Sequence, residues 1–162
     1  MAAWHALRAR DELDPARIGF FGFSEGGWVA PIAAARARDA AFVVAASGPC
    51  VSYAELNRHV NATRLRRDGF GEDDVAELLD ALDRVDAYVR SGAGASDVEA
   101  ILARLATRPW LSATNLGSRL PSREEMRTQL RWRSLDLDPS PDWERLRCPV
   151  LAVFGEDRKS VV

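Results

Sequence analysis

The chain has 162 residues, of which 47% are hydrophobic and 28% charged, as in a soluble globular protein with one domain and a sizeable core. Because 22 Lys and Arg nearly balance 24 Asp and Glu, the net charge of −2 gives no reason to expect nucleic acid or a membrane surface as a partner. No apolar run is as long as a transmembrane helix, and two cysteines make no disulfide framework, so we expect a cytoplasmic protein.

The amino-terminal stretch predicts a helix followed by a strand. Residues 1–13 have a helical pattern, which Asp14-Pro15 interrupts because proline cannot continue a helix. Residues 17–23 form an apolar run short enough for a buried strand.

This strand ends in Gly22-Phe23-Ser24-Glu25-Gly26, which fits the pattern G-x-S-x-G, and a segment of small residues, 26–37, then predicts a helix. Strand, tight turn and helix are the context in which this motif presents a nucleophilic serine. We expect Ser24 to have a strained backbone with positive φ, and a Cβ at Gly22 or Gly26 to collide with the crossing backbone. The first N–H groups of the helix would then face a developing oxyanion.

A Gly-rich strand-to-helix turn without a catalytic role is the alternative for this motif. Phosphate-binding loops do not fit, because the chain lacks Gly-Lys-Ser/Thr here and its glycines are not spaced as G-x-G-x-x-G. The helix contains Pro31, which should kink it, and a second apolar run follows at 41–47. Two buried strands joined by a helix predict a βαβ unit with parallel strands.

From Ser52 to about Trp143 the pattern predicts helices and no strand. The sequence favours helices over 53–67, from 72 to about 90, from 96 to about 105 and from 122 to about 132, with a loop at 138–141. Two of these helices would open with a capping box, at Ser96 to Glu99 and at Ser122 to Glu125. The aromatic residues of this segment fit core packing better than a substrate pocket. A third buried strand, 148–154, is followed by an acidic turn, Gly155-Glu156-Asp157.

At residues 17–32 and again at 148–157 the chain resembles the α/β-hydrolase family, in particular its esterase and serine-peptidase-like members. The resemblance implies an α/β fold with a partial α/β-hydrolase parallel sheet, three strands of which are evident, and a helical lid insertion. Residues 1–51 would form the nucleophile-elbow half of the core, residues 52–146 the lid, and residues 147–162 a core strand with the acid-bearing turn.

The resemblance also implies a serine hydrolase that cleaves a carboxylic ester, a thioester or a peptide-like bond in a small molecule, with no cofactor and no metal. Ser24 would be the nucleophile, and the N–H of Glu25 would bind the oxyanion beside the glycines Gly22 and Gly26. Asp157 would orient the catalytic histidine. Many relatives place this aspartate three residues after the glycine, where this chain has Arg158, so Glu156 is the second candidate.

The catalytic base is not evident, because His5 and His59 are the only histidines and both precede the acidic turn. In the family the base follows the acid. We therefore expect the catalytic histidine to lie outside this chain, the chain to be an internal piece of a longer hydrolase, and the 162 residues alone to be inactive. A non-catalytic α/β-hydrolase-like fragment or binding module is the alternative.

Overall fold

The computed structural model describes residues 1–155, apart from the side chain of Leu130. The chain divides into two compact units. We call residues 1–52, together with the segment that begins at Leu137, the sheet unit, and Tyr53–Asp136 the helical unit. The sequence had placed residues 137–146 in the helical insertion, and the structure places them in the sheet unit instead.

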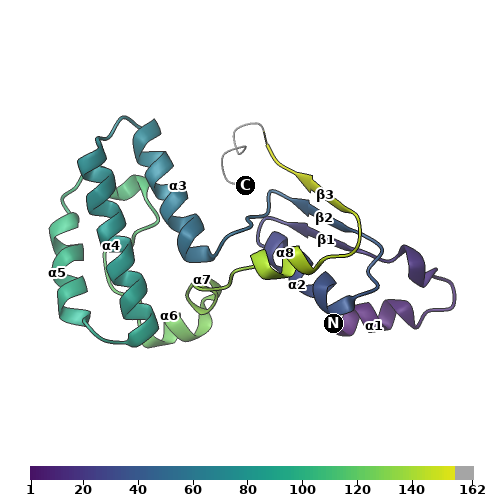
Figure 1. Ribbon diagram of the computed structural model, residues 1–162. Helices are drawn as coiled ribbons and strands as arrows, with labels where there is room; N and C mark the ends of the chain where they lie inside the picture. Colours follow the sequence, from purple (N-terminus) through teal and green to yellow (C-terminus); the bar gives the residue numbers. More distant parts are fainter. Residues whose placement is uncertain (156–162) are drawn as a thin grey trace. The chain divides into compact units, whose positions relative to one another are not determined.

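The sheet unit contains a three-stranded parallel sheet in the order β1-β2-β3 (Figure 1). Its strands are β1 (Phe20–Phe23), β2 (Val43–Ala46) and β3 (Val150–Val153). Each strand lies inside an apolar run that predicted it but is shorter than the run. Because the strands are parallel and in register, their carboxyl ends meet at one edge, which we call the carboxyl edge.

Helix α2 (Gly26–Ala37) joins β1 to β2 and packs on one face of the sheet. Its bounds match the prediction, and the helix continues through the buried Pro31. Small side chains let this helix approach the sheet closely, with Ala30 and Ala34 buried in the same core as Val43. The chain is therefore mixed α/β, with parallel strands connected through a helix.

Two further helices belong to the sheet unit. Helix α1 (Ala2–Arg8) stacks Trp4 on Phe20, with ring centroids 5.0 Å apart, so it lies near the amino end of β1. It ends before the predicted Leu13, and Pro15–Arg17, partly predicted as strand, forms a 3₁₀ turn capped by Asp14. Helix α8 (Ser140–Arg145) packs against α2 where the sequence predicted a loop, because Pro141 stands in its first turn, where proline is tolerated.

The opposite face of the sheet is exposed, which differs from the predicted buried strands. Along β1 the side chains of Phe21 and Phe23 are 69% and 64% exposed, and in β3 Leu151 is 57% exposed. Only β2 is well buried, with Val43 at 0% exposure. In the described part of the sheet unit the helices cover one face of β1 and β2, so alternate side chains of β1 remain in solvent, whereas all four residues of β3 are exposed.

The helical unit has an apolar core of its own, and no strand lies in its described residues. Its helices are α3 (Tyr53–Arg67), α4 (Glu72–Ser91), α5 (Ala95–Leu105), α6 (Arg123–Thr128) and α7 (Leu130–Arg133), with a 3₁₀ turn at Leu111–Ala113. The apolar stripe predicted along α4 is buried, and Trp110 is fully buried with its indole Nε1 donating to Asp74 Oδ1 at 2.9 Å. Core packing is therefore the role of Trp110.

Of the two predicted capping boxes, one is confirmed. Ser122 and Glu125 form the reciprocal pair at the start of α6. The second is wrong, because α5 already begins at Ala95 after the left-handed Gly94, and Ser96 lies inside the helix without capping it. The helix predicted to run from 122 to about 132 is also interrupted, since Gln129 takes an extended conformation between α6 and α7.

No helix in residues 1–155 combines the length and the apolar character needed to cross a bilayer.

Candidate active site

Ser24 lies on the tight turn between the end of β1 at Phe23 and the start of α2 at Gly26. Its φ of 53° is in the left-handed region, where a residue other than glycine is strained. The predicted positive φ is therefore confirmed. The residue is exposed at the carboxyl edge, so the strained turn presents its hydroxyl to solvent.

Two backbone hydrogen bonds hold this turn. The Ser24 N–H donates to the carbonyl of Ala46 at 2.9 Å, which ties the turn to the end of β2. The Ser24 carbonyl accepts from the N–H of Gly27 at 2.9 Å, which ties it to the first turn of α2. The backbone of Ser24 is thus fixed on both sides, and its strained conformation is maintained by the neighbouring strand and helix.

The two glycines of the motif have different roles. A Cβ at Gly22 would lie 2.1 Å from the carbonyl oxygen of Gly26 and 3.0 Å from the Cβ of Ala30, so the crossing of β1 and α2 requires glycine there. A Cβ at Gly26 would meet nothing within 4 Å, and Gly26 has no positive φ. The expected collision is confirmed at Gly22 and wrong at Gly26, because the first residue of α2 points away from the strand.

A second close approach, between Gly27 and Gly48, was not predicted because its two residues are distant in the chain. A Cβ on Gly27 would lie 2.2 Å from the Cα of Gly48, which follows β2. The signal was present as an extra glycine after the motif and a Ser-Gly-Pro sequence after the second strand. This contact presses the first turn of α2 against the loop that leaves β2.

Ser47, which follows β2, has the same left-handed backbone conformation as Ser24, and the sequence analysis did not predict it. Its φ is 52°, and its N–H donates to the carbonyl of Val153 at 2.8 Å, as Ser24 donates to Ala46. Because Phe23 pairs with Ala46, the two serines follow paired residues and lie next to each other along the carboxyl edge. Ser47 is half-buried, whereas Ser24 is exposed.

The start of α2 offers hydrogen-bond donors beside Ser24. Within the described residues the N–H groups of Glu25 and Gly26 donate no hydrogen bond, as expected for the first groups of a helix. Unsatisfied N–H groups at a helix start favour a negative charge through the helix dipole. The turn therefore combines an exposed hydroxyl with two free donors.

Neither histidine is placed to serve Ser24 from within its own unit. His5 lies on α1, whose Trp4 contacts Phe20 at the amino end of β1, whereas Ser24 follows the carboxyl end, about 13 Å further along the strand. His59 belongs to the helical unit, where its Nε2 lies 3.5 Å from Thr63 Oγ1. The predicted acid Asp157 and its alternative Glu156 lie outside the described residues.

The cysteine nearest the carboxyl edge is not an alternative nucleophile. Cys50 follows the loop after β2 and is half-buried, and this burial raises the pKa of its thiol. A raised pKa disfavours the thiolate, which is the reactive form of cysteine. Among the residues described by the structure, no three His, Cys, Asp or Glu side chains form a group that could hold a metal ion.

Comparison of the chain with models of protein families, with curated proteins and with solved structures gave no match.

Proposed function

We propose that the chain belongs to a serine hydrolase of the α/β-hydrolase type, with Ser24 as the nucleophile, acting on a carboxylic ester, a thioester or a peptide-like bond. The observation that carries the proposal is the positive φ of Ser24, 53°, on an exposed strand-to-helix turn. A strained serine at the carboxyl edge of a parallel sheet is the arrangement on which nucleophile elbows depend.

In the proposed reaction the Ser24 Oγ attacks the substrate carbonyl carbon and loses its proton to a histidine. The oxyanion accepts hydrogen bonds from the Glu25 N–H, with the Gly26 N–H free beside it. The tetrahedral intermediate collapses as the protonated histidine gives its proton to the departing alcohol, thiol or amine, which leaves an acyl-enzyme. Water, deprotonated by the same histidine, then releases the acid and restores Ser24.

The base and its partner are part of this proposal. We assign the base to a histidine beyond this sequence, because His5 lies toward the amino end of β1 and His59 has no observed relation to Ser24. Asp157, with Glu156 as the alternative, would accept a hydrogen bond from that histidine and fix its tautomer. β3 supports this assignment, since its carboxyl end lies at the same edge as Ser24 and the acidic turn follows it in sequence.

The helical unit is proposed to act as a lid. It is inserted between β2 and β3, after a strand whose end lies at the carboxyl edge beside Ser24. Segments inserted at this edge are where α/β sheets place substrate recognition. Its separate apolar core allows it to move as one body.

The test is covalent labelling of Ser24 by a fluorophosphonate, read by mass spectrometry of the digested protein. A chain extended beyond Val162 is compared with the 162-residue chain, each with a Ser24→Ala and a Ser47→Ala version. We expect labelling and ester turnover in the extended chain, both lost with Ser24→Ala and retained with Ser47→Ala.

The short chain should turn over an activated ester poorly, because a serine without a base remains a protonated, weak nucleophile. No labelling of Ser24 in the extended chain would contradict the proposal and favour a non-catalytic binding module. A Ser24-dependent turnover in the short chain that His59→Ala abolishes would move the base to His59.

A further inference from the structure

A cavity of about 220 Å³ lies within the helical unit, and none of its lining residues belongs to the sheet unit, which carries Ser24. Its walls come from α3, α4, the 115–121 segment and the α6–α7 region. Leu82, Val85 and Trp132 supply apolar surface, and Asp86 supplies a carboxylate. The volume is below that of pockets for drug-sized ligands, about 300–1,000 Å³, so the cavity suits a small molecule.

Asp86 is the unusual member of this wall. The residue is only 3% exposed, yet in the described part of the chain no hydrogen bond or ion pair satisfies its carboxylate. Buried carboxylates are normally paired or hydrogen-bonded, because the charge is costly to remove from water. Burial accordingly raises the pKa of Asp86 to about 6, with Asp83 and Asp136 adding to the rise and Arg90 and Arg58 opposing it.

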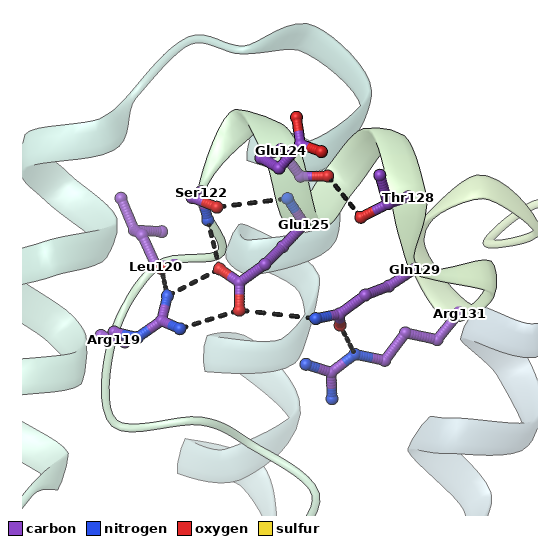
Figure 2. Close-up of polar contacts among 8 residues, drawn as sticks. All are labelled: Arg119, Leu120, Ser122, Glu124, Glu125, Thr128, Gln129 and Arg131. Atoms are coloured by element: carbon purple, nitrogen blue, oxygen red, sulfur yellow. Dashed lines mark hydrogen bonds and ion pairs between the residues drawn. The ribbon is translucent and has the colours of Figure 1, made fainter.

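The other carboxylate in the wall is already satisfied. Figure 2 shows Glu125 between Arg119 and Gln129. Its oxygens accept from both Arg119 Nη atoms at 2.8 Å, from the Ser122 N–H at 2.7 Å and from Gln129 Nε2 at 3.5 Å. Glu125 therefore holds its charge within the protein and needs no ligand.

The two arginines that line the cavity, Arg119 and Arg131, also make contacts within the protein. Arg119 pairs with Glu125 and also donates to the carbonyl of Leu120 at 2.9 Å. The Nε of Arg131 donates to the Gln129 side chain at 3.1 Å, and its guanidinium lies 4.4 Å from the centre of the Trp132 ring (Figure 2 shows the Gln129 contact). Arg119 is thus neutralised by Glu125, whereas Arg131 is held by a neutral amide and an aromatic ring. Of the two carboxylates that line the cavity, Asp86 is the one without a hydrogen bond or ion pair among the described residues.

A second buried polar group lies in the same wall. The indole Nε1 of Trp132 is buried without a hydrogen-bond acceptor among the described residues. An aromatic wall and an unpaired carboxylate are the two features that recognise an organic cation, through ring contact and a charge-assisted hydrogen bond.

We propose that this cavity binds a small organic amine in its protonated form, with the ammonium group at Asp86 and the apolar part against Leu82, Val85 and Trp132. The charge of the ligand would satisfy the buried carboxylate, and its apolar part would fill the space that the side chains leave. The site does not depend on the hydrolase function proposed for Ser24, since all of its residues belong to the helical unit.

The experiment measures binding of benzylamine to the full chain by isothermal calorimetry, together with the shift of the Trp132 indole N–H resonance by NMR. Benzyl alcohol and phenylacetate serve as neutral and anionic analogues. Asp86→Asn removes the charge with little change in shape, and the matched control is Asp80→Asn, on the exposed side of the same helix. We expect benzylamine to bind at neutral pH, and Asp86→Asn to weaken binding by more than about tenfold.

Asp80→Asn should leave the affinity unchanged, and both analogues should bind at least about tenfold more weakly than benzylamine. Below about pH 6 the affinity should fall, because protonation removes the charge of Asp86 while the amine remains a cation. Absence of benzylamine binding, equal binding to the Asp86→Asn variant, or tighter binding of phenylacetate would overturn the proposal. If Asp86→Asn fails to fold, the analogue series and the pH dependence of the wild-type chain decide the question.

Discussion

Gly27 and Gly48 lie back to back, and a Cβ on Gly27 would be only 2.2 Å from the Cα of Gly48. One glycine opens α2 and the other follows β2, so the contact presses the helix start against the neighbouring loop. Together with the hydrogen bond from Ser24 to Ala46, it fixes the strand-to-helix turn at two points. The strain at Ser24 is thus balanced by contacts that only glycine allows.

The two glycines of the G-x-S-x-G motif should respond differently to alanine. Gly22→Ala places a methyl group 2.1 Å from a backbone oxygen, so we expect a loss of about 1–3 kcal/mol in the free energy of unfolding. Gly26→Ala meets open space at a helical residue, so its effect should stay within about 0.5 kcal/mol. Urea unfolding of both variants measures the difference. Equal losses at the two positions would show that the turn is not packed as described.

Glycine should be tolerated unusually well at Ser24 and Ser47. Both have φ near 50°, where a residue with a Cβ costs about 1–2 kcal/mol more than glycine. We expect Ser24→Gly and Ser47→Gly to be at least as stable as the alanine variants at the same positions. In the exposed helical residue Ser96, glycine should instead be about 1 kcal/mol less stable than alanine. The same cost of glycine at all three positions would contradict the strained backbone.

The sequence predicted helices best where one local pattern decides the structure. The bounds of α2 and α3 follow from the segments of 26–37 and 53–67. The capping box at Ser122 is correct and that at Ser96 is wrong, although the two motifs look alike. The difference comes from Gly94, which caps α5 in a left-handed conformation, so that the helix begins at Ala95, two residues earlier than a cap at Ser96 would allow.

Features that join distant residues were not predictable. The strain at Ser24 follows from a five-residue motif, whereas the contact between Gly27 and Gly48 depends on how α2 crosses the sheet. The exposed side chains of β1 and β3 were predicted to be buried, because an apolar run indicates a buried strand but does not identify the element that packs against it. Asp86 did leave a signal, since it follows Leu82 by four residues and so shares the inward face of α4.

Alanine should change the stability differently at Ser122 and at Ser96, although the sequence predicted a capping box at both. Ser122→Ala removes the side-chain acceptor for the Glu125 N–H, 3.2 Å away, so we expect a loss of about 1 kcal/mol. Ser96→Ala removes no cap and adds a better helix former, so stability should be unchanged or slightly higher. Thermal or urea unfolding checks both variants. A loss at Ser96 equal to that at Ser122 would mean that Ser96 caps α5 after all.

Asp86 should make the protein less stable as the pH rises from about 4 to about 6. Burial raises the pKa of this carboxyl from its ordinary 3.8 to about 6 in the folded chain. Between these values the folded state binds more protons than the unfolded state, so the contribution of Asp86 to stability falls with rising pH and is lowest above about 6. Arg90, Arg58, Asp83 and Asp136 face this group, and Glu125, Arg119 and Arg131 line the same cavity.

Asp86→Asn removes this titrating group, so the free energy of unfolding of the variant should increase relative to that of the wild-type chain as the pH rises. We expect the two to be similar near about pH 4 and the variant to be more stable at neutral pH by about 1–3 kcal/mol. Urea unfolding of both chains across this range gives the difference, in which the other carboxyl groups cancel.

The matched control is Asp80→Asn, at an exposed residue whose carboxylate lies 2.9 Å from Arg84 on the same helix. An exposed pair of this kind contributes little, so its variant should differ from the wild-type chain by less than about 1 kcal/mol, with no comparable trend in pH. If Asp86→Asn lowered the stability equally at every pH, the carboxylate would have a partner in the folded chain. The unsatisfied charge on which the amine site depends would then be absent.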